Sequence, residues 1–257
     1  MEHFEIVAHR GYHIKFPENS IASYESAITL GADAIELDVR LTADRIPIVY
    51  HYYYLDELTT IQGPVFDYEL EQLHNAEFLR ESNSDWSEVK IPTLQEVLEE
   101  IGGRIGMEIE IKGPEPEAPE IIGNILCDFE HLWHGIEVTS YEPIFLLNIQ
   151  EFCPGLSTDL LFPRNDDWMR SDVILYNAIN KARLAQARAV HLHPMQLVED
   201  VVSSIRNEGI EVHAWDVNDV HSLERIVELG IPRICTDFPN KAIKFRDGYL
   251  SEVKKMG

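Results

Sequence analysis

Short apolar runs rich in β-branched residues alternate with segments of helical period along almost all of this 257-residue sequence. No other feature constrains the fold as strongly, because strand–helix units repeated in order form parallel sheets. Strands are expected near residues 4–8, 34–40, 105–110, 136–139, 156–160, 188–191, 211–215 and 233–236. Helices are expected near residues 20–30, 93–101, 118–130, 143–151, 171–186, 196–208, 219–229 and 240–252. Eight such units predict an α/β fold, a (β/α)₈ TIM barrel.

One segment departs from this alternation. Residues 46–50 form a strand-like run that follows the second expected strand after a very short connection, whereas a parallel crossover needs a dozen or more residues. We therefore expect residues 34–40 and 46–50 to form an antiparallel hairpin that places His51 over the barrel mouth. Residues 52–92 are expected to form a small cap insertion within a single domain, residues 1–257, since long insertions after a barrel strand usually lie over the site.

The ends of the first helix carry recognisable signals. Asn19 and Ser20 are both candidates for its N-cap, and Gly31 follows its last turn. These signals support a helix over residues 20–30.

The charge balance excludes several classes of partner. The formal net charge is −24 and the sequence pI is about 4.7, so the surface repels nucleic acids and acidic lipids. Cys127, Cys153 and Cys235 form no CxxC pair, which favours reduced structural thiols over a secreted disulfide framework. The amino-terminus has no signal-peptide pattern, and no apolar run is long enough to cross a bilayer. We therefore expect a cytoplasmic protein without a stable membrane anchor.

Carboxylates gather at two expected strand ends. Glu36 and Asp38 share one face of the second strand, and Glu108 and Glu110 share one face of the third, because residues i and i+2 point the same way. In a (β/α)₈ barrel the carboxyl ends of the strands meet at one mouth. Several acids crowded together call for a cation, and a hard divalent ion such as Mg²⁺ or Ca²⁺ suits oxygen ligands better than Zn²⁺ does.

Two histidines and two cations accompany these acids. His9 and His51 are a candidate acid–base pair, because imidazole titrates near neutrality. Arg10 and Lys112 are suited to a phosphate oxygen, and they also balance the carboxylate charge. An anionic protein repels a phosphate substrate, so local positive charge of this kind is needed for such a substrate to bind.

The motifs occur in an order that resembles one known family. They are AHRG (8–11), PENS (17–20), GADAIELDV (31–39), IPIVYH (46–51), IPTLQEVL (91–98), EIK (110–112), the pair Ser140–Tyr141, WDVN (215–218) and GIPRICTDFP (230–239). In this order and combination the sequence resembles the glycerophosphodiester phosphodiesterases, within the wider group of phospholipase-C-like phosphodiesterases. The resemblance extends over nearly the whole chain.

The resemblance implies a set of roles and a reaction. It implies one divalent metal ion held by Glu36, Asp38 and Glu110, acid–base catalysis by His9 and His51, phosphate binding by Arg10 and Lys112, and an apolar wall at Trp215. The implied substrate is a small glycerophosphodiester. In the implied reaction a glycerol hydroxyl attacks phosphorus, an alcohol leaves, and water opens the cyclic phosphate to give glycerol 3-phosphate.

Two positions depart from the family pattern. Tyr52, Tyr53 and Tyr54 follow His51, where the family usually has Asp directly after this histidine. The tyrosines are expected either to alter the leaving-group pocket, including a cation–π site, or to pack the insertion. Glu108 stands where an uncharged residue is more familiar, and it is expected to contact Lys112 or Arg10.

Two other functions remain open on these residues. One is a barrel that binds a metal and glycerol phosphate without catalysis, which Tyr52 favours. The other is a phosphodiesterase that acts on lysophospholipids, which would need an exposed apolar lip or an amphipathic helix.

Overall fold

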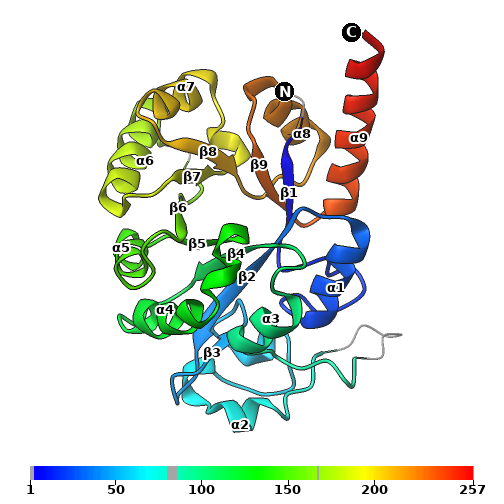
Figure 1. Cartoon of the computed structure of the whole chain (residues 1–257), viewed down its shortest axis with the longest axis vertical. Helices are drawn as coiled ribbons and strands as arrows, with labels where there is room; N and C mark the ends of the chain where they lie inside the picture. Colours follow the sequence, from blue (N-terminus) through cyan, green and yellow to red (C-terminus); the bar gives the residue numbers. More distant parts are fainter. Residues whose placement is uncertain (1–2, 80–85, 167, 257) are drawn as a thin grey trace.

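In the described part of the chain, residues 3–79, 86–166 and 168–256 of a computed structural model, eight parallel strands alternate with helices (Figure 1). The strands are β1 (Glu5–Ala8), β2 (Ala34–Leu41), β4 (Gly106–Ile111), β5 (Ile136–Ser140), β6 (Ser157–Leu161), β7 (Ala189–Leu192), β8 (Glu211–Ala214) and β9 (Arg233–Thr236). The helices that follow them are α1 (Ile21–Leu30), α3 (Leu94–Ile101), α4 (Ala118–Asp128), α5 (Pro143–Phe152), α6 (Ser171–Ala185), α7 (Glu199–Asn207), α8 (Val220–Leu229) and α9 (Pro239–Met256). The predicted segments agree with these bounds to within a few residues.

These strands close into a barrel. They pair in the order β1-β9-β8-β7-β6-β5-β4-β2, and β1 also pairs with β2, so the ring is complete. Along β2 the side chains alternate as the strand period requires. Ile35 and Leu37 belong to the apolar layer shared with the helices, whereas Glu36 and Asp38 occupy the other face and point into the barrel. The predicted (β/α)₈ TIM barrel is confirmed.

The hairpin predicted from the short connection is also present. β3 (Pro47–Val49) pairs antiparallel with β2, with Val39 opposite Val49 and Leu41 opposite Pro47. In the turn, the Thr42 hydroxyl accepts a hydrogen bond from the backbone N–H of Ile46 at 2.9 Å. β3 therefore lies outside the parallel ring, and the chain continues directly from it to His51.

The segment after β3 packs around a small core of its own. It contains the 3₁₀ turns η1 (Leu55–Glu57) and η2 (Val65–Asp67) and the short helix α2 (Leu70–Leu73). The buried apolar residues of this core are Ile48 from β3 and, from the segment after it, Tyr50, Leu55, Val65, Leu73, Ala76, Phe78 and Ile91. In Figure 1 it lies with β3 at one end of the molecule. Trp86 Nε1 donates a hydrogen bond to the Lys15 carbonyl, 3.0 Å away, and so joins the segment to the loop after β1. Residues 80–85 of the predicted cap lie outside the described residues.

The start of α1 resolves the choice between two N-cap candidates. Ser20 is the N-cap, and its hydroxyl accepts a hydrogen bond from the Ser23 backbone N–H at 3.2 Å. Gly31 ends the helix with φ +85°, a left-handed conformation that glycine adopts without strain. Asn19 is left free for another role at the barrel mouth.

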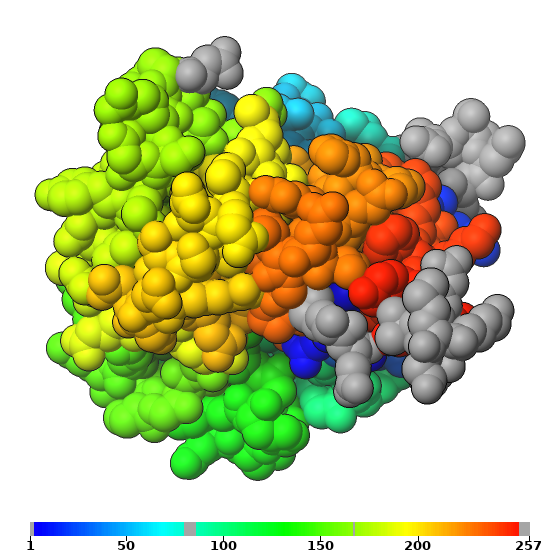
Figure 2. Space-filling view, turned by 90° about the horizontal axis from the view of Figure 1, so that it is seen from above, coloured from blue at the N-terminus to red at the C-terminus, as the bar shows by residue number. Residues whose placement is uncertain are grey.

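The second half of the chain covers one side of the molecule. Figure 2 shows the yellow and orange segments, which include α7, β8 and α8, lying side by side across the middle of that face. Within the described ranges, no helix combines the length and the apolar composition needed to cross a membrane.

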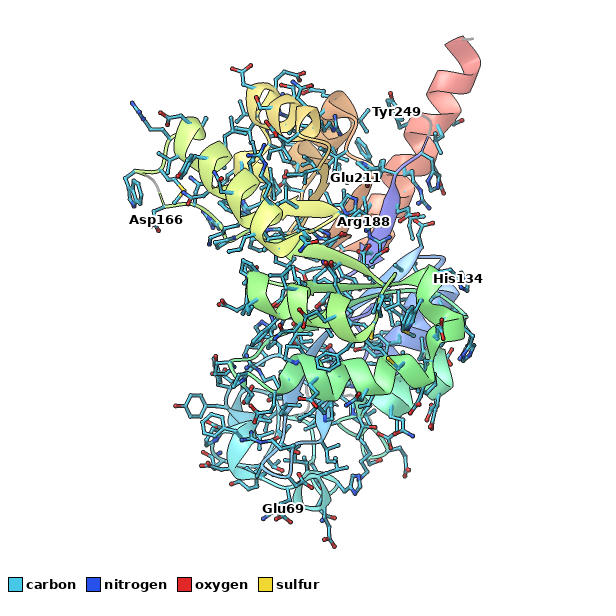
Figure 3. All side chains as sticks on the ribbon, turned by 60° about the vertical axis from the view of Figure 1, so that its left-hand side comes forward. Glu69, His134, Asp166, Arg188, Glu211 and Tyr249 are labelled. Carbon is cyan, nitrogen blue, oxygen red and sulfur yellow. The ribbon has the colours of Figure 1, made fainter. Side chains whose placement is uncertain are left out.

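A charged network fills the barrel interior toward the amino-terminal ends of the strands. Its members are Glu108, Glu137, Asp159, Arg188, His191, His213 and Arg233. Arg188 binds Asp159 with two hydrogen bonds of 3.0 and 2.6 Å, and Figure 3 shows Arg188 near Glu211, which contacts His213. This network balances buried acids with guanidinium and imidazolium groups, as buried charges require.

Glu108 belongs to this network, so its predicted contact with Lys112 or Arg10 is wrong. Its carboxylate lies 3.3 Å from His191 Nδ1 and 4.0 Å from Arg233 Nε. Glu108 precedes Glu110 by two residues on the same face of β4. It therefore lies closer to the amino-terminal end of the barrel, where His191 and Arg233 contact it. The negative charge of Glu108 therefore balances the positive charges of His191 and Arg233 at the amino-terminal end of the barrel.

His191 makes the stability of this network depend on pH. Although burial disfavours its charged form, Glu108 and Asp159 raise the pKa of His191 from 6.5 to about 10. The stabilisation is therefore complete below pH 6.5 and is lost as the pH rises toward 10. The pKa of His213 is lowered, first by burial, so its contribution changes below pH 6.5. Burial raises the pKa of Glu137 to about 8, so Glu137 also destabilises the folded protein as the pH rises toward 8, in the same direction as His191.

We expect the free energy of unfolding of the wild type to fall by at least about 1 kcal/mol between pH 7 and pH 9, since one pKa unit corresponds to about 1.4 kcal/mol. In His191→Gln the fall should be smaller, because the amide does not titrate. Urea unfolding followed by circular dichroism at several pH values measures both. His221→Gln, which alters a histidine that is 93% exposed, is the matched control. Equal pH dependence in wild type and His191→Gln would contradict this assignment.

Candidate active site

The strand ends of β1, β2 and β4 converge with the end of β3 on one pocket at the barrel mouth. The pocket has a volume of about 140 Å³. Seven of the eight predicted site residues line it: His9, Arg10, Glu36, His51, Glu110, Lys112 and Trp215. The eighth, Asp38, is fully buried beneath them. The structure thus brings the whole predicted set together.

Three carboxylates form the centre of the site. Glu36, Asp38 and Glu110 each present an oxygen, and these oxygens all lie within 4.8 Å of one another. Burial, followed by the neighbouring charges of Asp38 and Glu110, raises the pKa of Glu36 well above its ordinary value. Among the described residues, Glu36 Oε1 is buried without a hydrogen-bond partner. A free carboxylate oxygen in an all-oxygen donor set fits a hard divalent cation.

Two cations already contact the most buried of these acids. Lys112 Nζ lies 2.9 Å from Asp38 and 2.7 Å from Glu110, and Arg10 Nε lies 3.2 Å from Asp38. Although burial opposes ionisation, Lys112 and then Arg10 hold the pKa of Asp38 well below its ordinary range. Asp38 is therefore ionised, and Lys112 and Arg10 are fixed at the edge of the carboxylate cluster.

Asn19 orients Asp38 from the other side. Its Nδ2 donates a hydrogen bond of 2.7 Å to the Asp38 carboxylate, and its Oδ1 accepts hydrogen bonds from the Asp38 backbone N–H and the Tyr24 hydroxyl. Asn19 adopts a positive φ of 55°, which asparagine tolerates better than most residues. The sequence predicts Asn19 only as a helix cap; its position in the PENS motif is the signal that points to this role at the site.

The loop after β1 is held tightly against α1 and β2. The Arg10 backbone N–H donates to Glu36 Oε2 at 3.0 Å, and its guanidinium donates to Glu18 at 2.7 Å. Gly11 follows with φ +80°, and a Cβ there would lie 2.4 Å from the Ser23 hydroxyl oxygen. Only glycine fits this close approach, which explains the glycine of the HRG sequence. The contact between Arg10 and Glu18 is not predicted from the sequence.

His9 has a carboxylate partner that the sequence analysis did not assign. Its Nδ1 lies 2.6 Å from Asp237 Oδ1, at the end of β9, and its Nε2 lies 3.8 Å from Glu36. Asn218 donates to the other oxygen of Asp237 at 2.7 Å, and its own Oδ1 accepts from the Asp237 backbone N–H. Although burial opposes it, the hydrogen bond with His9 lowers the pKa of Asp237 to about 2. The ionised Asp237 therefore fixes the orientation of the His9 ring.

We expect Asp237→Asn to lower kcat by about 10- to 100-fold with little change in KM, because a hydrogen bond to a charged group contributes about 1.5–3 kcal/mol. Asp237→Glu should recover part of the loss, since it restores the negative charge. Steady-state kinetics on a glycerophosphodiester measures both variants, and Asp247→Asn, at a carboxylate that is 67% exposed, is the control. An Asp237→Asn enzyme with the kcat of the wild type would contradict this orienting role.

His51 occupies a different environment. Its Nδ1 is buried and has no hydrogen-bond partner among the described residues, and burial lowers the pKa of the ring to about 3. Its backbone carbonyl accepts a hydrogen bond of 2.7 Å from Arg40 Nε, and Arg40 also donates to the Gly113 carbonyl at 3.2 Å. Arg40 thus joins the hairpin to the loop after β4 and positions His51. Burial thus favours the neutral form of the ring, the form that a general base needs.

The tyrosines after His51 have different surroundings. The Tyr52 ring packs edge-on against His51, with centroids 4.7 Å apart, and the Arg10 guanidinium carbon lies 5.9 Å from the Tyr52 centroid. Tyr53 is stacked by Arg40 at 4.0 Å, so its face is already occupied by a cation of the protein. Tyr54 is 55% exposed. Tyr52 is therefore the tyrosine that contacts the site residues, and it packs where the family pattern has Asp.

Trp215 forms one wall of the pocket. Its Nε1 donates a hydrogen bond of 3.0 Å to the Phe162 carbonyl, which satisfies the polar end of the indole. The His193 ring packs against it with centroids 5.2 Å apart, and His193 Nε2 lies 3.1 Å from Asp216. These contacts hold the apolar ring in place beside the charged groups.

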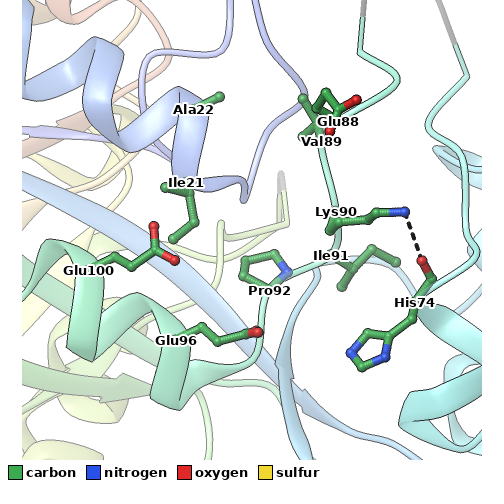
Figure 4. Close-up of a pocket in the computed structure, with 10 residues that line it drawn as sticks. All are labelled: Ile21, Ala22, His74, Glu88, Val89, Lys90, Ile91, Pro92, Glu96 and Glu100. Atoms are coloured by element: carbon green, nitrogen blue, oxygen red, sulfur yellow. Dashed lines mark hydrogen bonds between the residues drawn. The ribbon is translucent and has the colours of Figure 1, made fainter.

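A larger pocket lies elsewhere on the molecule. Figure 4 shows it between α1, α3 and the segment after β3, with Ile21, His74, Lys90 and Glu100 among its lining residues. Its volume is about 480 Å³, but none of the eight predicted site residues lines it. The pocket at the barrel mouth, where titratable groups converge, is therefore the better candidate for the active site in spite of its smaller volume.

The chain matches the sequence model of the glycerophosphoryl diester phosphodiesterase family over residues 9–241, and it belongs to this family of hydrolases. It is 31% identical to YhdW of Bacillus subtilis over 93% of this chain and 96% of that protein. It is 28% identical to the glycerophosphodiester phosphodiesterase of Caldanaerobacter subterraneus, again over 93% of this chain and 96% of the relative. A solved phosphodiesterase structure from Oleispira antarctica superposes with a TM-score of 0.78 at 22% identity, covering 95% of this chain and 96% of that one, which shows the shared fold.

Proposed function

We propose that this protein hydrolyses small glycerophosphodiesters to an alcohol and glycerol 3-phosphate. The observation that carries the proposal is the convergence of three carboxylates, two imidazoles and two cations on one pocket at the barrel mouth. The family assignment supports the reaction class. The Oleispira antarctica structure is described as a complex with the product sn-glycerol-3-phosphate, which supports the proposed product.

Glu36, Asp38 and Glu110 would hold one divalent cation, Mg²⁺ or Ca²⁺. When bound, the cation supplies charge stabilisation to the phosphoryl oxygens. Arg10 and Lys112, held beside Asp38, add positive charge for the phosphate at the rim of the cluster. This local charge offsets the repulsion between a strongly anionic protein and an anionic substrate.

His51 and His9 divide the proton transfers. The neutral His51 ring would accept the proton of the glycerol hydroxyl as that oxygen attacks phosphorus. His9, oriented by the ionised Asp237, would donate a proton to the departing alkoxide. The product of this step is a cyclic phosphate and a free alcohol. In the second step the roles reverse, and water opens the ring to give glycerol 3-phosphate. Trp215 would form the apolar wall beside the glycerol.

A panel of glycerophosphodiesters tests this proposal. Glycerophosphocholine, glycerophosphoethanolamine and glycerophosphoglycerol would each be incubated with the enzyme and Mg²⁺ or Ca²⁺, and released glycerol 3-phosphate would be measured. We expect turnover of at least one diester and its loss in EDTA. Binding of glycerol 3-phosphate without turnover of any diester would contradict the proposal and favour a binding protein.

A second candidate function is hydrolysis of lysophospholipids. Exposed apolar side chains follow several strands, namely Ile14 after β1, Tyr54 in the segment after β3, Trp168 after β6 and Met195 in the 3₁₀ turn after β7. Trp168 is 68% exposed and lies on the loop after β6. Such residues could contact an acyl chain that leaves the pocket. A higher kcat/KM for lysophosphatidylcholine than for glycerophosphocholine, reduced by Trp168→Ala, would support this function, and the reverse preference would exclude it.

We also propose that the protein acts in the cytoplasm on a small-molecule substrate. The free thiols support a reducing compartment, and the acidic composition supports the absence of nucleic-acid partners. Cell fractionation followed by immunoblotting tests the location, and recovery in the secreted fraction would contradict it.

A further inference from the structure

Two of the three cysteines lie side by side on the outer layer of the barrel. Cys127 is in the last turn of α4, Cys153 is the C-cap of α5, and their Sγ atoms are 3.6 Å apart. Both are free thiols. Neither lines the pocket at the barrel mouth, so the chemistry of these two thiols is independent of the proposed reaction.

A glycine brings the two sulfurs together. A Cβ placed on Gly123 of α4 would lie 3.0 Å from Phe152 Cβ and 3.7 Å from Cys153 Sγ, so the absent side chain allows α5 to approach closely. Each thiol also donates to a carbonyl of the opposite helix. Cys127 donates to Phe152 at 3.4 Å, and Cys153 donates to Gly123 at 3.3 Å. The two helices thus hold the sulfurs in contact from both sides.

The two thiols differ in their access to solvent. Cys127 is exposed, whereas Cys153 is fully buried. Burial, together with the contact from Cys127, raises the pKa of Cys153 to about 12. An external oxidant therefore meets Cys127 first, and Cys153 is placed to react only with the sulfur of Cys127.

We propose that Cys127 and Cys153 form an oxidant-responsive dithiol that closes to a disulfide when the protein meets a small-molecule disulfide such as oxidised glutathione. The Cys127 thiolate attacks one sulfur of the small disulfide, the S–S bond of that molecule breaks, and one thiol leaves. Cys153 then loses its proton and attacks Cys127 Sγ, which expels the second thiol. In sum, the protein dithiol is oxidised to a disulfide and the small disulfide is reduced to two thiols. The sulfurs approach by about 1.5 Å to reach the bond length of about 2.05 Å, and the new bond joins α4 to α5.

The test is differential alkylation of the whole protein. Native protein is incubated with oxidised glutathione, denatured, treated with iodoacetamide and digested. We expect a Cys127–Cys153 cross-linked peptide, protection of these two thiols, and full alkylation of Cys235, which is buried in β9 and is the internal control. Dithiothreitol should restore alkylation of all three thiols. A lasting glutathione adduct on Cys127, a dimer linked through Cys127, or three alkylated thiols would each overturn the proposal.

Two variants separate the steps. Cys153→Ser should leave glutathione on Cys127 without a cross-link, because the resolving thiol is missing. Cys127→Ser should take up no glutathione, because Cys153 is inaccessible. Circular dichroism checks the fold of each variant. Because Cys127 is exposed, Cys127→Ser is expected to fold. This variant therefore tests which thiol is attacked first even if Cys153→Ser does not fold. Modification of Cys153 in Cys127→Ser would overturn the proposed order.

Discussion

His51→Ala is expected to lower kcat for glycerophosphodiester hydrolysis by about 10²–10⁴-fold, the contribution that a general acid or base typically makes. The half-buried ring lines the pocket with the carboxylates, and its Nδ1 has no hydrogen-bond partner among the described residues. Removing the ring removes the proton acceptor for the attacking hydroxyl. Because His51 has no hydrogen bond to the three carboxylates among the described residues, metal affinity should change little. His9→Ala should lose activity over the same range, since the second proton transfer depends on it.

Steady-state kinetics and metal titration by calorimetry measure these effects together. His221→Ala, on the exposed face of α8, is the matched control and should retain both kcat and metal affinity. If His51→Ala kept the kcat of the wild type on every diester of the panel, the mechanism with two histidines would be excluded. Loss of metal affinity together with activity would instead mean that His51 supports the carboxylate cluster.

Glu36→Gln is expected to abolish measurable metal binding at millimolar Mg²⁺ or Ca²⁺ and to lower activity by more than about 100-fold. Residues that only support metal ligands already cost about 10–100-fold in affinity or activity when they are replaced, and a direct ligand should cost more. The fold should survive, because an amide oxygen can still accept the hydrogen bond from the Arg10 backbone N–H. The variant should unfold no earlier than the wild type, since the neutral amide cannot take the charged form that burial beside Asp38 and Glu110 disfavours.

Calorimetric titration with each cation, activity with and without EDTA, and thermal unfolding check this expectation. Glu151→Gln, at an exposed carboxylate on α5, is the control and should behave as the wild type. Full activity of the wild-type protein in excess EDTA would contradict the metal requirement. Unchanged metal affinity in Glu36→Gln would contradict the ligand assignment while leaving the family assignment intact.

The features that the sequence determined by itself depend on local spacing. Alternation of apolar runs with helical periods predicted the parallel barrel, and the short connection after residue 40 predicted the antiparallel hairpin. The two-residue period of a strand put Glu36 and Asp38 on one face, and parallel strand ends share one edge of a barrel. These rules act over a few residues or over a whole repeat, so they can be applied without coordinates.

Tertiary structure decided which distant groups meet. Asp237 contacts His9 although 228 positions separate them in the sequence. Asn19, a candidate helix cap in the sequence, instead donates a hydrogen bond to Asp38. Glu108 pairs with His191 and not with Lys112, which is nearer in the sequence, because Glu108 lies closer to the amino-terminal end of the barrel interior. Each of these contacts depends on strand register and on the depth of a residue in the barrel. Those quantities are set by how all eight strands pack together, and no short stretch of the sequence contains them.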